Sequence, residues 1–165
     1  KWIRRHINGK RIAMVFQDPM TSLDPTMTIG KQIMEGMLWH YKMPKDAAYK
    51  KAVQLLEEVG ITDAEKRMKS YPHQLSGGMR QRVVIAIALS CDPDLLICDE
   101  PTGNLDPQTS RGIMDLLERI NRTGTTVLVA THDREMVDNM RRRVIALDRG
   151  HLTRDQDRGV YGFDV

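Results

Sequence analysis

Short apolar runs alternate with longer amphipathic segments along most of this chain. Apolar runs bounded by turn residues predict strands at residues 11–16, 94–98, 125–130 and 144–147, of which 11–16 and 125–130 are expected in the core. Apolar positions at helical spacing predict helices at residues 27–40, 45–59, 77–90, 107–123 and 134–140. Strands that alternate with helices in this order imply a parallel sheet with right-handed crossovers. Residues 20–90 carry helical patterns only, so we expect a helical insertion between two strands of that sheet.

Composition and charge narrow the class of protein. The 165 residues are 41% hydrophobic and 28% charged, which is typical of one globular domain. No apolar run approaches the roughly 20 residues of a membrane span. The net charge of +3 comes from basic residues spread along the chain, so we expect no nucleic-acid partner. Cys91 and Cys98 have no partner at metal-binding spacing, and we expect them to pack as small apolar groups in a reducing compartment.

Small residues open one of the predicted helices, in the segment LSGGMRQR at residues 75–82. Ser76 can cap this helix, and Gly77 and Gly78 let its backbone approach a ligand. The free N–H groups and the dipole of a helix start favour an anion such as a terminal phosphate. A plain capped helix start carries the same residues, so this segment alone leaves both interpretations open.

Polar residues follow three of the predicted strands. Asp99 and Glu100 end one strand, where Asp99 can organise Mg²⁺ and Glu100 can polarise an attacking water. His132 follows another strand and can hydrogen-bond a γ-phosphate. Gln17 follows the first strand and can contact Mg²⁺ or a water. Taken singly, a histidine such as His132 is more often structural and a glutamine such as Gln17 is more often a loop residue, and two acids at a strand end are common.

Taken in order, the motifs resemble those of the ATP-binding cassette (ABC) ATPases, over most of the chain. The resemblance implies an α/β, P-loop NTPase-like (RecA-like) core with a parallel sheet, incomplete at the N-terminus, and an inserted helical subdomain. It implies ATP and Mg²⁺ as cofactors, with Glu100, His132 and Gln17 as catalytic residues. Asp99 and Gln17 are the Mg²⁺ ligands that it implies. The residues implied to contact ATP across a subunit interface are Leu75, Ser76, Gly77, Gly78, Gln81 and Asp106.

The same resemblance divides the chain into four parts. Residues 1–19 are expected to be a remnant of the core that includes the Q-loop strand. Residues 20–90 form the helical subdomain, which ends in the signature motif, and residues 91–150 return to the core with the Walker B strand, the D-loop and the switch histidine. Residues 151–165 form a tail.

Two branches of the family share the resemblance. FQDPMTSLDP at residues 16–25 and YPHQ at residues 71–74 are similar to the oligopeptide, dipeptide and nickel importers. TGNLD at residues 102–106 departs from the importer pattern, and residues 117–150 resemble the bacterial cell-division ATPase that activates peptidoglycan hydrolases. The change near residues 101–104 is compatible with recombination, an engineered chimera or a protein outside both branches.

The P-loop pattern G-x-x-x-x-G-K-[ST] is not found in the sequence. Gly9-Lys10 and Gly30-Lys31 both lack the first glycine and the final Ser or Thr. Because the family places its P-loop before the Q-loop strand, we expect this chain to be the C-terminal part of a nucleotide-binding domain. We then expect the isolated chain neither to bind ATP tightly nor to hydrolyse it. We also expect its sheet to expose an edge and apolar surface.

The resemblance implies partners as well as cofactors. They are membrane permease subunits and a second ABC ATPase subunit, so the chain is expected in the cytoplasm, on the inner face of the cell membrane. Residues 27–39 lie where the helical subdomain of the family receives the permease. ATP hydrolysis coupled to peptide import is therefore the function that we expect. A cell-division ATPase and a non-catalytic interaction fragment remain the alternatives, and a P-loop upstream in the native gene would argue against the fragment.

Overall fold

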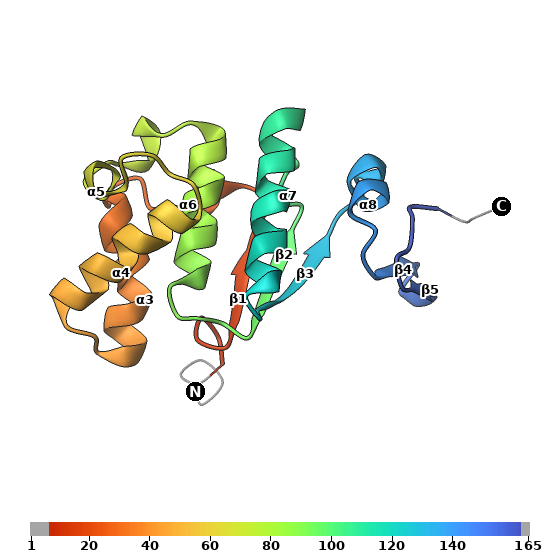
Figure 1. The fold of residues 1–165 in the computed structure, drawn as a ribbon, viewed down its shortest axis with the longest axis horizontal. Helices are drawn as coiled ribbons and strands as arrows, with labels where there is room; N and C mark the ends of the chain where they lie inside the picture. The colour runs from red at the N-terminus through yellow and green to blue at the C-terminus, as the bar shows by residue number, and fades with distance from the viewer. Residues whose placement is uncertain (1–6, 163–165) are drawn as a thin grey trace. The chain divides into compact units, whose positions relative to one another are not determined.

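A three-stranded parallel sheet forms the centre of the fold (Figure 1). The structure is a computed structural model that describes residues 7–162. Strands β1 (Ile12–Val15), β2 (Leu95–Asp99) and β3 (Thr126–Ala130) lie in that order and pair in parallel. The parallel sheet predicted from the alternation of strands and helices is confirmed.

Every major helix predicted in the first 130 residues is present within two residues of its predicted bounds. Residues 20–90 contain only helices and their connections, as their apolar spacing predicts. Three short helical turns, which have no apolar periodicity, were not predicted. The helices are α2 (Pro19–Ser22), α3 (Ile29–Tyr41), α4 (Lys45–Glu58), α5 (Ala64–Arg67), the 3₁₀ turn η1 (Pro72–Gln74), α6 (Gly77–Leu89) and α7 (Pro107–Arg122).

Helices α6 and α7 cover one face of the sheet, α6 against β1 and α7 against β3 (Figure 1). Val15, Leu96 and Cys98 are fully buried beneath them. The other side of α6 packs against α3 and α4, so this helix is apolar around most of its circumference. The core is therefore continuous: α6 joins the apolar face of the sheet to α3 and α4 of the helical insertion.

The opposite face of the sheet is apolar but exposed. Along β1, Ile12 and Met14 alternate with buried residues and are 36% and 45% exposed. Leu128 of β3, which the strand register aligns with Met14 through Ile97, is 50% exposed. The exposed apolar surface expected from the sequence is therefore present on this face.

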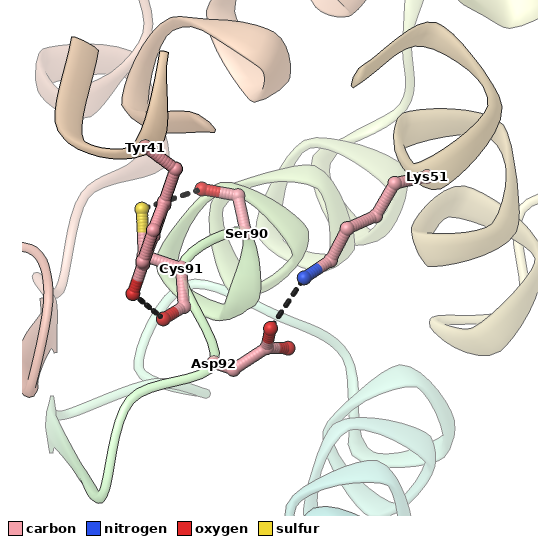
Figure 2. Close-up of polar contacts among 5 residues, drawn as sticks. All are labelled: Tyr41, Lys51, Ser90, Cys91 and Asp92. Atoms are coloured by element: carbon pink, nitrogen blue, oxygen red, sulfur yellow. Dashed lines mark hydrogen bonds and ion pairs between the residues drawn. The ribbon is translucent and has the colours of Figure 1, made fainter. Parts of the chain in front are cut away.

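The turn between α6 and β2 is held by side chains from two helices of the insertion (Figure 2). The Tyr41 hydroxyl at the end of α3 donates to the carbonyl oxygen of Cys91 at 3.0 Å. Lys51 of α4 forms an ion pair with Asp92, and the Ser90 hydroxyl lies 3.8 Å from the Cys91 sulfur. These contacts tie the insertion to the start of β2, whose other end carries the two predicted site acids.

The described residues form two compact units that divide between Ala130 and Thr131. The second unit contains helix α8 (Arg134–Met140) and an antiparallel pair of strands, β4 (Val144–Asp148) and β5 (His151–Gln156). Among residues 7–162, the structure has no helix that is long and apolar enough to cross a membrane.

The second unit differs from the sequence prediction in one respect. Residues 144–147 form a strand, as predicted, but it pairs antiparallel with β5 instead of extending the parallel sheet. Arg149 and Gly150 both have positive φ, at +47° and +80°, which is the backbone of a type I′ hairpin turn. The segment HLTRDQ at residues 151–156 lacks alternating apolar positions, so part of the expected tail was not predicted as a strand.

Candidate functional site

The parallel register brings three predicted site residues to one edge of the sheet. Val15 of β1 lies opposite Cys98 of β2, so Gln17 and the pair Asp99 and Glu100 leave neighbouring strands at the same edge. This is the carboxyl edge, where open α/β sheets place their ligands. The side chains of Gln17 and Asp99 are exposed, whereas that of Glu100 is half-buried.

Glu100 has the left-handed backbone that L-residues rarely adopt, with φ at +45°. Its N–H donates to the carbonyl oxygen of Ala130 at 2.9 Å, and its own carbonyl accepts from the N–H of Gly103 at 3.1 Å. The strand therefore turns sharply at this residue. A non-glycine residue in this region costs of order 1–3 kcal/mol, and such strain concentrates at functional sites.

The Gln17 side chain packs against the turn that follows Glu100. A Cβ atom at Gly103 would lie 3.2 Å from the Gln17 amide nitrogen, so glycine gives that amide room. Gln17 and Asp99 together offer amide and carboxylate oxygens to solvent. This donor set fits Mg²⁺, which binds few protein oxygens and keeps several waters.

The start of α6 has the geometry that its sequence predicts. Ser76 caps the helix by accepting from the N–H of Met79 at 3.3 Å. Gly77 and Gly78 are the first helical residues, whose N–H groups have no acceptor within the helix. Leu75 and Gln81, in contrast, are 5% and 1% exposed, so their side chains offer almost no surface to a ligand.

Gly78 is required by a neighbouring helix. A Cβ atom at Gly78 would lie 2.5 Å from the Cγ2 of Thr109 in α7, whereas one at Gly77 would make an ordinary contact of 3.7 Å with Leu105. The close approach inferred from the two glycines therefore has an intramolecular cause at one position. At Gly77, no neighbouring helix excludes a Cβ atom.

Asp106 caps α7 through both of its carboxylate oxygens. One oxygen accepts from the N–H groups of Gln108 and Thr109 at 3.1 Å and 3.0 Å. The other accepts from the Thr109 hydroxyl at 2.5 Å. The hydrogen bond from the Thr109 side chain, followed by that from its backbone, lowers the pKa of Asp106. The predicted N-cap is confirmed, and a contact between Asp106 and ATP stays a prediction.

The residues after β1, the start of α6 and the loop after β2 enclose a cavity of about 150 Å³. The sequence motifs include most of its lining. Arg80 lies in the segment at residues 75–82 but was not assigned as a site residue. A larger cavity of about 600 Å³ lies toward the other ends of the strands and contains no predicted site residue. The smaller cavity is lined by Gln17, Asp18, Pro19, Met20, Gly77, Arg80, Gln81, Pro101, Asn104 and Leu105.

His132 belongs to the second unit, where it is exposed and lies two residues beyond β3. The residues on either side of it hold the start of α8. The Thr131 hydroxyl accepts from the N–H of Asp133, whose carboxylate accepts from the N–H of Met136, both at 3.1 Å. The role of His132 beside the first-unit residues stays a prediction.

The two Gly-Lys pairs have other structural roles. Gly9 lies in a turn before β1, with φ at +68°. Gly30 lies in the first turn of α3, where a Cβ atom would lie 2.8 Å from the carbonyl oxygen of Met68. Neither pair joins the end of a strand to a helix, as a P-loop does.

The chain is similar to known proteins over most of its length, so its motifs are not a chance likeness. The family model described as "ABC transporter" matches residues 2–103 of the chain. The chain belongs to the ABC transporter family. Its α/β cassette fold is found in solved structures of that family: it matches the dimeric bacterial ABC transporter cassette MJ0796 with a TM-score of 0.77 and 34% identity, over 98% of this chain and 66% of that one. It also matches cbiO1 from Clostridium perfringens, part of the transporter complex cbiONQ, with a TM-score of 0.78 and 33% identity, over 88% of this cassette and 57% of that chain.

Curated relatives of the cassette come from both branches that the sequence patterns indicate. The dipeptide transport ATP-binding protein DppD of Bacillus subtilis is 49% identical over 149 residues, which are 90% of this chain and 44% of DppD. The cell division ATP-binding protein FtsE of Mycobacterium tuberculosis is 58% identical over 119 residues, which are 72% of this chain and 50% of FtsE. The cassette therefore spans half the length of these relatives or less.

Proposed function

We propose that the chain is part of the nucleotide-binding subunit of an ABC transporter that couples ATP hydrolysis to peptide import. The observation that carries this proposal is the meeting of three motifs at one edge of the sheet. Gln17, the acids at the end of β2 and the start of α6 surround or adjoin one small cavity. The likeness to DppD over 90% of the chain supports peptides as the transported class.

The residues that follow β1, β2 and β3 would have different roles in ATP hydrolysis. Asp99 and Gln17 would hold Mg²⁺, which supplies positive charge to the phosphates of ATP when bound. Glu100 would accept a hydrogen bond from the attacking water and orient it toward the γ-phosphate. The strained backbone at Glu100 supports this role because such strain concentrates at functional sites. His132 would hydrogen-bond the γ-phosphate from the loop after β3.

The start of α6 would serve a nucleotide held by a second subunit. Ser76 and the free N–H groups of Gly77 and Gly78 offer donors and the positive end of a helix dipole to phosphate. Leu75 and Gln81 are buried, so in this proposal they support that backbone from within the chain. The dimeric cassette MJ0796 supports a two-subunit arrangement for this chain.

The remaining parts of the proposal concern placement in the cell. Residues 20–90 would form the helical subdomain and residues 27–39 would contribute to the surface for permease subunits. Trp39 is 77% exposed on α3, which supports an unpartnered surface at the end of that helix. The subunit would then lie in the cytoplasm against the inner face of the membrane.

The first experiment measures nucleotide binding by the isolated 165-residue chain. We expect no micromolar affinity for MgATP and no turnover, because positioning of the phosphates carries most of phosphoryl transfer and the sequence has no P-loop. Isothermal titration with MgATP checks this. Micromolar binding that is lost in Glu100→Gln or Gln17→Ala would contradict it.

The second experiment measures ATPase activity in the protein that contains this chain, together with its permease. Glu100→Gln should lower kcat by about 10²–10⁴-fold, the usual contribution of a general base. The exposed Glu65→Gln in α5 is the matched control and should leave kcat unchanged. Gly77→Ala should also lower activity without loss of stability, because its Cβ has room beside Leu105. Full activity in Glu100→Gln would overturn the proposed role.

One alternative function has a specific observation in its favour. FtsE is 58% identical to this chain over 119 residues, a higher identity than that of DppD over a shorter span. A cell-division role predicts that Glu100→Gln blocks septation while peptide uptake continues. Loss of peptide uptake with normal septation would support the importer. A non-catalytic fragment predicts no effect of Glu100→Gln on either process.

A further inference from the structure

The side chain of Arg82, on α6, bridges the two helices between which α6 lies, α4 and α7 (Figure 1). Its Nη1 donates to the carbonyl oxygen of Val59 at the end of α4, at 2.6 Å. A Cβ atom at Gly112 of α7 would lie 2.9 Å from its Nη2, and one at Gly60, directly after α4, would lie 3.1 Å from its Nη1. The guanidinium therefore occupies a space that both glycines leave open.

The hydrogen bond to Val59 has an electrostatic cause. Carbonyl groups at the end of a helix have no N–H partner within it, and the negative end of the helix dipole attracts a cation. The Arg82 side chain is partly buried, and burial, followed by the charge of Arg119, lowers its pKa. The charge-assisted hydrogen bond to Val59 offsets part of this lost hydration and fixes the position of the guanidinium.

The contact lies close to the starts of both α6 and α7. Arg82 and Gly112 are each the sixth residue of their helix, so they lie less than two turns from its start. The starts themselves meet where Gly78 approaches Thr109. Helices α6 and α7 thus touch at two levels, and the end of α4 is bonded to the second of them.

We propose that Arg82 is a positioning residue that couples the end of α4 to the first turn of α6. This inference rests on the proposed function, in which Ser76 and Gly77 face a nucleotide held by a second subunit. The permease surface is proposed on α3, which packs against α4. A displacement of the helical insertion would then move the phosphate donors without any contact between permease and nucleotide.

Hydrogen exchange in the 165-residue chain, followed by NMR, tests the coupling without nucleotide. Arg82→Lys keeps the charge on a single nitrogen, which cannot reach Val59 and also fill the space beside Gly112. We expect exchange about tenfold faster at the N–H of Gly60 after α4 and at the N–H of Arg80 in the first turn of α6, through more frequent local opening. The N–H groups of β2 should be unchanged.

Two results would overturn the proposal. Faster exchange at Gly60 alone would show that Arg82 only caps α4. Equal acceleration at Gly60, at Arg80 and in β2 would show a general loss of stability, without a specific link between α4 and α6.

Gly112→Ala disturbs the same contact from α7 while Arg82 is unchanged. The added methyl displaces Nη2 and should give the same pattern of faster exchange. In the Arg82→Lys background, which has no Nη2, it should have no such effect, because alanine is otherwise the better helix former. The exposed Arg111→Lys is the matched control and should leave exchange unchanged. Equal acceleration by Gly112→Ala in both backgrounds would contradict the coupling.

A double-mutant cycle tests the consequence for ATPase activity in the protein that contains this chain, together with its permease. Arg82→Lys should lower kcat about tenfold or more, because small displacements of binding groups are costly. Added to Gly77→Ala, it should cause little further loss, since both changes act on the same first turn. Effects that multiply would assign Arg82 to stability alone and overturn the proposal. Absence of ATPase activity in the unsubstituted protein would contradict the proposed function, and hydrogen exchange would then decide the coupling by itself.

Discussion

At the scale of single residues, the buried thiol of Cys98 should be protected from thiol reagents in the native chain. Its side chain has no exposed surface in β2, and burial raises the pKa of its thiol to about 12. At pH 8 only about one such thiol in ten thousand is ionised, and the thiolate is the reactive species. We therefore expect Cys98 to react with a thiol reagent only as fast as the chain unfolds. Cys91→Ala isolates this thiol, and rapid labelling of the native variant would show that the core is open.

A second residue-scale prediction concerns Asp106 and acid. Hydrogen bonds from Thr109 lower the pKa of Asp106, so its carboxylate favours the folded state. This contribution is complete above the ordinary aspartate pKa of about 4 and is lost as the pH falls through the lower folded value. Asp106→Asn should therefore lower the melting temperature at pH 7 more than at pH 3. Asp115→Asn, an exposed site on the same helix, is the control. An equal loss at both pH values would show that the cap acts without its charge.

At the scale of elements, the approach of α6 to α7 depends on one methyl group. A Cβ atom at Gly78 would overlap the Cγ2 of Thr109, so Gly78→Ala should destabilise the fold by about 1–3 kcal/mol in urea denaturation. Adding Thr109→Ser removes that methyl, keeps the hydroxyl on Asp106 and should restore most of the stability. Gly77→Ala is the matched control with a small effect. If the double variant is as unstable as Gly78→Ala, another neighbour is responsible.

The elements also show which patterns in the sequence are reliable. Helices α3, α4 and α7 were predicted because each buries an apolar stripe, and α6 because it is apolar around most of its circumference. Strands β1–β3 were predicted because each is a short apolar run between turns. Strand β5 was not predicted because its residues are polar on both faces, so only its pairing with β4 defines it. Pairing is a tertiary property that periodicity does not report.

At the scale of the whole molecule, the same distinction applies to the site. Gln17, Asp99 and Glu100 could be assigned to one edge from the sequence, because parallel strands share their carboxyl ends. The burial of Gln81 could not be predicted from the sequence, because it follows from the packing of α6 between the sheet and α3. The cavity of about 150 Å³ beside Gln17 could not be predicted for the same reason, since its walls come from three segments far apart in the chain.

The last prediction concerns the exposed face of the sheet in the first unit. Met14 and Leu128 share this face, and contiguous exposed apolar surface favours association. We expect the isolated chain to self-associate with rising concentration in sedimentation velocity. Met14→Lys with Leu128→Lys should restore a monomer without lowering the melting temperature, because both side chains are about half exposed. Trp39→Lys, at an apolar and more exposed position on α3, should leave association unchanged. A monomer in that variant instead would move the contact from the sheet to the helical insertion.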